Sequence, residues 1–248
     1  MWRVRNPVEN ILNADGKWRM LVFDNELSSA LFTDGKDYNG IILSEVFNET
    51  SRISKNFGCK LFKSLLKSLK FKSLFINAIS DIRNIDFEEN RVYNYIDGLN
   101  SIVEPLMYNH LIRFGPKWVL YDPLEYYQRE IGTFKRWLYN RFDSFMRNLA
   151  KYFNFKPSKE VSITSNNFLK GSFIVNNGWK LFEEEYKGLY FGENTLYFTA
   201  VPSKGIFQYW RVKNCKSAEN KEEINFKSNN IILAINPLEG CSAQAYFK

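Results

Sequence analysis

The hydrophobic pattern of the chain changes its period once, and this change constrains the fold more than any other feature of the sequence. From residue 56 to about 154, apolar residues recur every three or four positions, as in helices with one buried face. After the segment FNFKPSKE, short β-prone runs alternate between apolar and polar residues, separated by Gly, Asn, Ser and Pro. We therefore predict an α+β chain with a helical domain over residues 1–156 and an all-β, sandwich-like module over 158–248, called the β module below.

Four helical segments are expected in the first part. The first two carry the apolar stripes Leu61–Leu69 and Phe75–Ile82. Asp86 and Glu89 have the spacing of a capping box, which predicts where the third helix begins. The stripe of this third helix is made of Val92, Ile96, Leu99, Val103 and Leu106, and Pro105 should bend the helix or end it nearby.

The fourth helix has the clearest start, in the segment DPLE. Asp122 is a good N-cap residue, Pro123 suits the first helical position, and Glu125 can return a hydrogen bond to the cap. The apolar stripe that follows predicts a helix of about thirty residues.

A pair of carboxylates follows the predicted strand Arg19–Phe23, in the stretch GKWRMLVFDNELSSAL. Asp24 and Glu26 are two residues apart, so in extended backbone their side chains lie on the same face and can reach one cation. Carboxylates of this kind hold the magnesium that phosphoryl transfer requires. The spacing alone leaves two alternatives open: a metal site, or a strand end with two solvated acids.

Several segments in order along the chain resemble the CotH kinase family, the spore-coat-protein-H-like atypical protein kinases. They are MWRV, GKWRMLVFDNEL, the leucine-rich helical segment from LFKSLLKSLK to MYNHLIRFG, FMRNLAKYFNF, and GLYFGENTLYFTAVPSKGIFQYWRV in the β module. Together these segments cover nearly the whole chain. The resemblance implies the helical large lobe of an atypical protein kinase with one short sheet, followed by an all-β accessory module.

The resemblance also implies a chemistry. Asp24 stands at the family's metal-binding aspartate and Glu26 at its second acidic position, so the expected cofactors are Mg²⁺ and ATP. The implied reaction transfers the γ-phosphate of ATP to Ser or Thr of spore-coat or cell-surface proteins, which would place the protein on a spore or cell surface. Glu26 departs from the usual Asp, and Leu27–Ser29 replace the usual aromatic residue and glycine.

A second departure concerns the rest of the kinase site. In the family, the catalytic aspartate, a metal-binding asparagine and the small lobe with its nucleotide-gripping lysine all precede the MWR segment, which here begins at Met1. Lys17 and Lys36 lie in turn-rich segments and are no substitute for that lobe. The chain thus resembles the C-terminal portion of such a kinase, and we expect no catalytic residue within it and no activity from the isolated chain.

Other chemistries find little support. The chain has no phosphate loop and no nucleophile elbow, and its one histidine, His110, is expected to be structural or at the surface. The three cysteines lack metal-binding spacing; Cys215 and Cys241 could pair in an exported protein, but the sequence does not decide this. No apolar run is long enough for a membrane span, and the first residues lack the apolar region of a secretory signal.

Two rival functions follow from charge and aromatic content. The net charge of +7 suits an anionic partner, but the lysines of KSLLKSLKFKS fall on the polar face of a helix, so we expect a solvated surface and no nucleic acid. The other rival is non-catalytic binding or scaffolding, in which rings of the β module receive carbohydrate or protein; the alternative is that the rings fill its core. These rings are Trp179, Tyr186, Tyr190, Phe191, Phe207, Tyr209 and Trp210.

Overall fold

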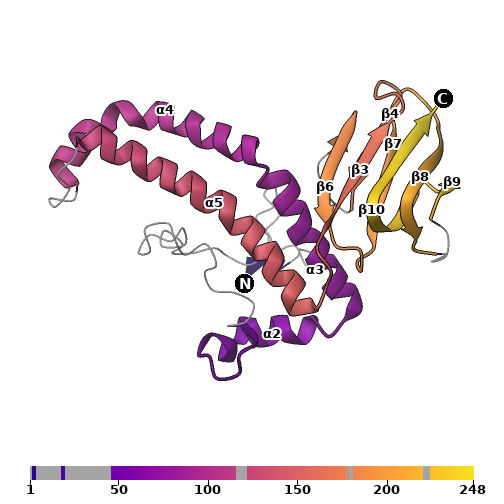
Figure 1. Ribbon diagram of the computed structural model, residues 1–248, viewed down its shortest axis with the longest axis horizontal. Helices are drawn as coiled ribbons and strands as arrows, with labels where there is room; N and C mark the ends of the chain where they lie inside the picture. Colours follow the sequence, from indigo (N-terminus) through magenta and orange to yellow (C-terminus); the bar gives the residue numbers. More distant parts are fainter. Residues whose placement is uncertain are drawn as a thin grey trace.

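The computed structural model describes residues 2–3, 18–19, 46–115, 122–176, 178, 181–219 and 224–248. The helices lie between residues 53 and 153 and the large sheet follows them, which confirms the α+β class (Figure 1). The last helix ends at Phe153 and the β module's first strand begins at Lys159, on either side of Pro157. The helical elements are η1 (Ile53–Lys55), α2 (Phe57–Leu65), α3 (Leu69–Asp81), the π-helix η2 (Ile82–Asp86), α4 (Glu89–Phe114) and α5 (Pro123–Phe153).

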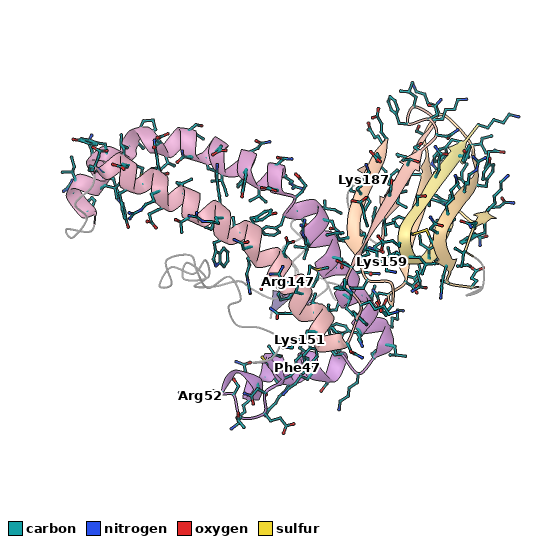
Figure 2. The ribbon with its side chains drawn as sticks, in the orientation of Figure 1. Phe47, Arg52, Arg147, Lys151, Lys159 and Lys187 are labelled. Atoms are coloured by element: carbon teal, nitrogen blue, oxygen red, sulfur yellow. A yellow bond between two sulfur atoms is a disulfide. The ribbon has the colours of Figure 1, made fainter. Side chains whose placement is uncertain are left out.

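Helices α4 and α5 form a long antiparallel hairpin (Figure 1). Polar side chains join the two helices along its length: Lys135 donates to Asp97, and the Gln128 amide donates to the Glu104 carboxylate at 2.7 Å. The predicted start of α5 is confirmed, because the Asp122 carboxylate accepts from the backbone N–H groups of residues 124 and 125 at 2.9 and 3.3 Å. Phe47 lies against the last turns of α5 near Lys151 (Figure 2), where its ring stacks on Tyr152 at 4.1 Å.

The start of α4 was predicted wrongly. Its N-cap is Glu88, whose carboxylate accepts from the backbone N–H groups of Asn90 and Arg91 at 3.1 and 2.8 Å. Asp86 cannot act as the cap because it belongs to the π-helix η2 that continues α3. Pro105 does not end α4, which continues to Phe114, and Figure 1 shows the helix bending in its second half, where a proline removes one backbone hydrogen bond.

The leucine stripe 61–69 does not form one helix. Ser68 caps α3 by accepting from the Phe71 N–H, so Leu69 opens a new helix and is 83 % exposed. The helical core is instead built from Ile76 of α3, Met146 and Leu149 of α5, and Phe191 of the β module. In α4 only the Ile96 member of the predicted stripe is buried; Leu99, Val103 and Leu106 are exposed to solvent in the described part of the chain.

The β module contains one continuously hydrogen-bonded sheet of eight strands that folds about β10. The first residues of β10 pair with β7 and its last residues pair with β3. On its other side β10 pairs with β8, with a register shift between Pro237 and Ser242. Large residues from both halves of the sheet fill one core, including Phe173, Phe198 and Trp210, each 0 % exposed. The strands are β3 (Lys159–Ser165), β4 (Gly171–Val175), β5 (Leu181–Phe182), β6 (Glu185–Tyr190), β7 (Leu196–Pro202), β8 (Phe207–Ser217), β9 (Phe226–Ser228) and β10 (Ile232–Phe247).

A disulfide links β8 to β10. Cys215 and Cys241 are bonded, with their Cα atoms 4.9 Å apart, and both are buried in the core of the β module. The sequence left this pairing open, and the structure settles it because neighbouring strands bring together residues 26 positions apart. Cys59, in α2, is a free thiol.

Near the N-terminus, β1 (Trp2–Arg3) pairs antiparallel with β2 (Trp18–Arg19). The Trp-Arg pairs of the MWR and KWR segments, which carried part of the family resemblance, therefore lie side by side. The predicted strand Arg19–Phe23 overlaps β2 at Arg19, and its other residues lie outside the described part of the chain. No described helix combines the length and the apolar character that crossing a membrane would require.

Candidate functional site

The predicted metal ligands, Asp24 and Glu26, lie outside the described residues. The nearest described element before them is β2, which ends at Arg19 and is paired with β1. As a donor set, two carboxylates fit magnesium, which takes oxygen ligands. Elsewhere, the described ranges contain no cluster of three or more His, Cys, Asp or Glu residues that could hold a metal ion.

The most elaborate polar site in the described structure lies where α3 meets the β module. Its centre is Asp81, at the end of α3. One carboxylate oxygen of Asp81 accepts from the Tyr190 hydroxyl at 2.6 Å, and the Asn176 amide donates to both oxygens at 2.8 and 3.0 Å. The Tyr190 and Tyr186 hydroxyls are 2.5 Å apart, so the acid ends a short chain of buried polar groups.

Burial dominates the electrostatics of this site. Desolvation raises the pKa of Asp81 from 3.8 to about 6, against the opposing hydrogen bonds from Tyr190 and Asn176, and the nearby negative charge of Asp86 adds to the rise. Desolvation likewise raises the pKa of Tyr186 and of Tyr190 above the usual value of 10. Both phenols therefore stay protonated at neutral pH and can donate hydrogen bonds.

Asparagines extend the network along the same helix face. The Asn77 amide donates to the Thr195 carbonyl at 2.8 Å, and the Asn194 amide donates to the Asn77 carbonyl oxygen at 2.5 Å. Residues 77, 81 and 84 are spaced four and three apart, so their side chains share one face, which turns toward the β module. The sequence carried this signal as a polar stripe among the isoleucines of α3, but our sequence analysis did not single it out.

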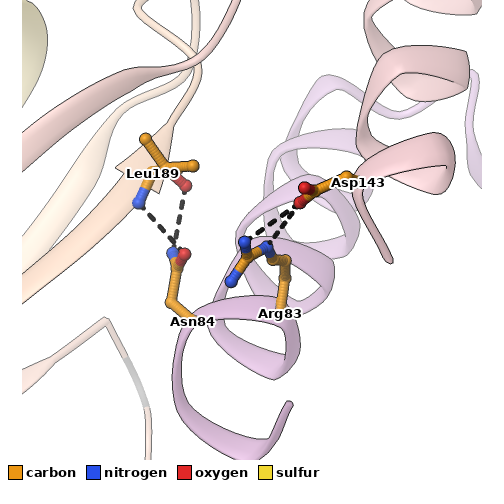
Figure 3. A network of polar contacts seen from close by, with 4 residues as sticks. All are labelled: Arg83, Asn84, Asp143 and Leu189. Carbon is orange, nitrogen blue, oxygen red and sulfur yellow. Dashed lines mark hydrogen bonds and ion pairs between the residues drawn. The ribbon is translucent and has the colours of Figure 1, made fainter. Parts of the chain in front are cut away.

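The π-helix η2 joins both neighbours through two consecutive residues (Figure 3). Arg83 binds α5, its Nε and Nη2 donating to one carboxylate oxygen of Asp143 at 3.1 and 3.0 Å. Asn84 binds β6, where its amide donates to the Leu189 carbonyl at 3.0 Å and its oxygen accepts from the Leu189 N–H at 3.0 Å. A single turn of helix thereby fixes the long hairpin and the sheet relative to each other.

Two cavities flank this junction, each of about 340 Å³. One lies between α3 and strands β4 and β7 and is lined by Asn77, Asp81, Asp86, Asn176 and Tyr197, among others. The other lies beside α5 and is lined by Arg83, Asp143, Arg147, Phe155 and Leu189, among others. Figure 2 shows Arg147 on α5 and Lys159 at the start of β3 on either side of this junction.

The polar groups of this junction have a structural role. Both oxygens of Asp81 already accept hydrogen bonds, and Asn176 also accepts from the Tyr197 N–H at 3.1 Å, so these groups are occupied in holding α3 to the sheet.

His110, the one histidine, lies far along the hairpin on the exposed surface of α4, where its ring is 5.3 Å from that of Phe114. The described residues therefore supply no assembled set of nucleophile and base.

The rings of the β module are mostly core. Tyr186, Tyr190, Phe191 and Trp210 are at most 5 % exposed, Phe207 and Tyr209 are half-buried, and Trp179 lies outside the described residues. Of the two explanations for the aromatic content, filling of the core holds for these four.

No curated protein and no solved structure matches the chain. A family model described as "CotH kinase protein" matches residues 11–152, a range that includes Asp24, Glu26 and all the helices described above except the last residue of α5. Because this match spans more than half of the chain, it agrees with the resemblance seen in the sequence: the chain belongs to the CotH kinase family.

Proposed function

We propose that this chain is the large-lobe part of a CotH-like atypical protein kinase, which transfers the γ-phosphate of ATP to Ser or Thr of spore-coat or cell-surface proteins. The observation that carries the proposal is the family match over residues 11–152, which contains the acidic pair expected to bind the metal. Asp24 would be the principal magnesium ligand and Glu26 would assist. When bound, magnesium neutralises charge on the nucleotide phosphates and orients them for transfer.

The helical part suits the role of a platform. The α4–α5 hairpin is long, antiparallel and cross-linked by polar side chains, and η2 ties it to the β module through Arg83 and Asn84. Phosphoryl transfer depends mainly on positioning and electrostatic stabilisation, so a rigid platform is the expected contribution of this lobe. We expect no phosphoryl transfer from the chain alone, since no residue in it resembles the family's catalytic base or its nucleotide-gripping lysine.

The disulfide supports a surface location. Disulfides persist in oxidising surroundings such as the cell exterior and are rare where thiols are kept reduced. The bond between Cys215 and Cys241 therefore agrees with a protein exposed on a spore or cell.

Magnesium-dependent thermal stability tests the metal site. We expect millimolar Mg²⁺ to raise the melting temperature of the wild-type chain, because an ion that binds only the folded state stabilises it. The rise should vanish in Asp24→Ala and be reduced in Glu26→Gln. The matched control is Glu239→Gln, an exposed acid on β10, which should respond as the wild type does. A wild type that ignores Mg²⁺ at constant ionic strength, or an Asp24→Ala variant that responds fully, would remove the chemical basis of the proposal.

A second candidate function is non-catalytic binding through the β module. The aromatic surface that suggested it is largely absent, because most of its rings are core. Binding would have to use the outward-facing residues of the sheet, which include several cations.

A further inference from the structure

One face of the β module is a polar surface built from five neighbouring strands, β6, β3, β10, β8 and β9 (Figure 1). Along β3, Val161 and Ile163 are buried, so Ser162 and Thr164 point outward. The strand register then aligns outward residues in rows across the sheet. One row is Lys187, Ser162, Ser242 and Lys213; the next is Glu185, Thr164, Gln244, Arg211 and Lys227. We call these nine residues, with Tyr209 and Tyr246, the outer face.

The middle of the outer face is hollowed. A groove of about 220 Å³ is lined by Ser162, Thr164, Arg211, Lys213, Ser242, Ala243 and Gln244. Short hydroxyl and amide side chains on β3 and β10 form its floor, and the long cationic side chains of β8 form one wall. Hydroxyl and amide groups both donate and accept hydrogen bonds, whereas the arginine and the lysine only donate.

Three cations of the outer face have no ion-pair partner among the described residues. Lys187 pairs with Glu185 at 3.2 Å, but no described acid lies within ion-pair distance of Arg211, Lys213 or Lys227. Lys187 is visible on β6 in Figure 2. The outer face is thus polarised, with its one acid, Glu185, on β6 and three cations without a described acidic partner on β8 and β9.

Two tyrosines hold two of these cations in place. The rings of Tyr209 and Tyr246 stack at 4.6 Å; the Arg211 guanidinium lies 4.8 Å from the Tyr246 ring and the Lys227 ammonium 4.8 Å from the Tyr209 ring. Cation–π contacts of this kind restrain long side chains and leave their N–H groups available. The cations are therefore partly ordered before any ligand arrives, which lowers the entropic cost of binding an anion.

We propose that the outer face binds an acidic polysaccharide, with carboxylate or sulfate groups against Arg211 and Lys213 and sugar hydroxyls on the floor of Ser162, Thr164, Ser242 and Gln244. A polyhydroxylated chain uses both the donors and the acceptors of this floor. An extended polymer also matches a surface that runs across several strands about 4.8 Å apart. This inference does not depend on phosphoryl transfer, and it gives the β module a ligand of its own.

The geometry argues against other anionic polymers. Single-stranded nucleic acid is held by bases stacked on aromatic side chains, but here the tyrosine rings are stacked on each other and approached by cations. Extended peptides usually add to the free edge of a sheet, whereas this surface is a sheet face whose backbone groups are already paired with neighbouring strands.

Binding of polygalacturonate to the full chain at about 0.15 M salt tests the proposal, since salt screens diffuse attraction beyond about 8 Å. We expect Arg211→Gln combined with Lys213→Gln to weaken binding by about tenfold or more, as charge-assisted hydrogen bonds are lost. Thr164→Val combined with Ser242→Ala leaves the charge unchanged and should weaken binding by about threefold, through lost hydrogen bonds.

The control is Lys60→Gln combined with Lys67→Gln, two exposed lysines in α2 and in the turn after it, which give the same change in net charge. It should bind within about twofold of wild type, because distant exposed charges are screened. Equal weakening by both double variants would show attraction by net charge only and overturn the proposal. So would unchanged binding in the hydroxyl variant, or competition by single-stranded DNA or a phosphopeptide at equal charge concentration.

Discussion

Asp81 gives the junction between α3 and the β module a measurable pH dependence. In the folded chain the pKa of Asp81 is about 6, against 3.8 for an ordinary aspartate. Between these values the folded state holds a proton that the unfolded state has lost, so the free energy of unfolding falls as the pH rises. The rise in pKa corresponds to about 3 kcal/mol, most of which is lost between about pH 4 and pH 7.

The perturbation is Asp81→Asn, which cannot ionise. The asparagine oxygen can still accept from Tyr190, but its amide would face the Asn176 amide, donor against donor, and Asn176 is fixed by the Tyr197 N–H. This mismatch lowers stability by a similar amount at every pH and leaves the slope unaffected. The expected signature is therefore a stability difference, wild type minus variant, that is about 2.4 kcal/mol larger at pH 4 than at pH 7.

Urea unfolding at several pH values from 4 to 7, followed by tryptophan fluorescence, measures this difference. Using the difference cancels the titration of other acids, which act equally in both proteins. Asp122→Asn is the matched control for the exchange of Asp by Asn: it removes an exposed carboxylate and keeps a good helix cap. Parallel curves for wild type and Asp81→Asn, or a difference that grows with pH, would refute the assignment of a desolvated acid at this joint.

Two further predictions concern the β module. Replacing Cys215 and Cys241 with alanine should lower the free energy of unfolding by about 3.5 kcal/mol, from the entropy of the 26-residue loop, and a wild type whose urea midpoint ignores reductant would contradict this. Gly171→Ala should cost about 1–3 kcal/mol, because the new Cβ would lie 2.3 Å from the Phe247 ring, while Gly98→Ala in α4, with nothing within 4 Å, should be neutral or stabilising in the same thermal-unfolding assay.

Local signals in the sequence were sufficient for the broad fold. The change of hydrophobic period separated helices from strands, and Asp122 with Pro123 marked the start of α5, because capping depends on residues close in sequence. The cap of α4 was missed because η2 absorbs Asp86 and delays the new helix to Glu89. A π-helical turn reflects tertiary packing, which no short-range pattern encodes.

Features that depend on contacts between distant residues could not be predicted from the sequence pattern. Pairing of Cys215 with Cys241 depends on two strands meeting across 26 residues. The burial of Asp81 depends on the β module closing over α3, and its pKa follows from that contact. The predicted metal pair, Asp24 and Glu26, lies outside the described residues and stays a prediction.

The two hydrogen bonds between Asn84 and Leu189 protect the protein from self-association. β6 ends the β5-to-β6 strand path, and the amide of Asn84 occupies both backbone groups of Leu189 that would otherwise face outward. An uncovered edge strand can form backbone hydrogen bonds with a second copy of the same chain. The helical part thus covers the edge of the sheet at Leu189. An isolated β module would expose this edge strand, through which two copies could associate.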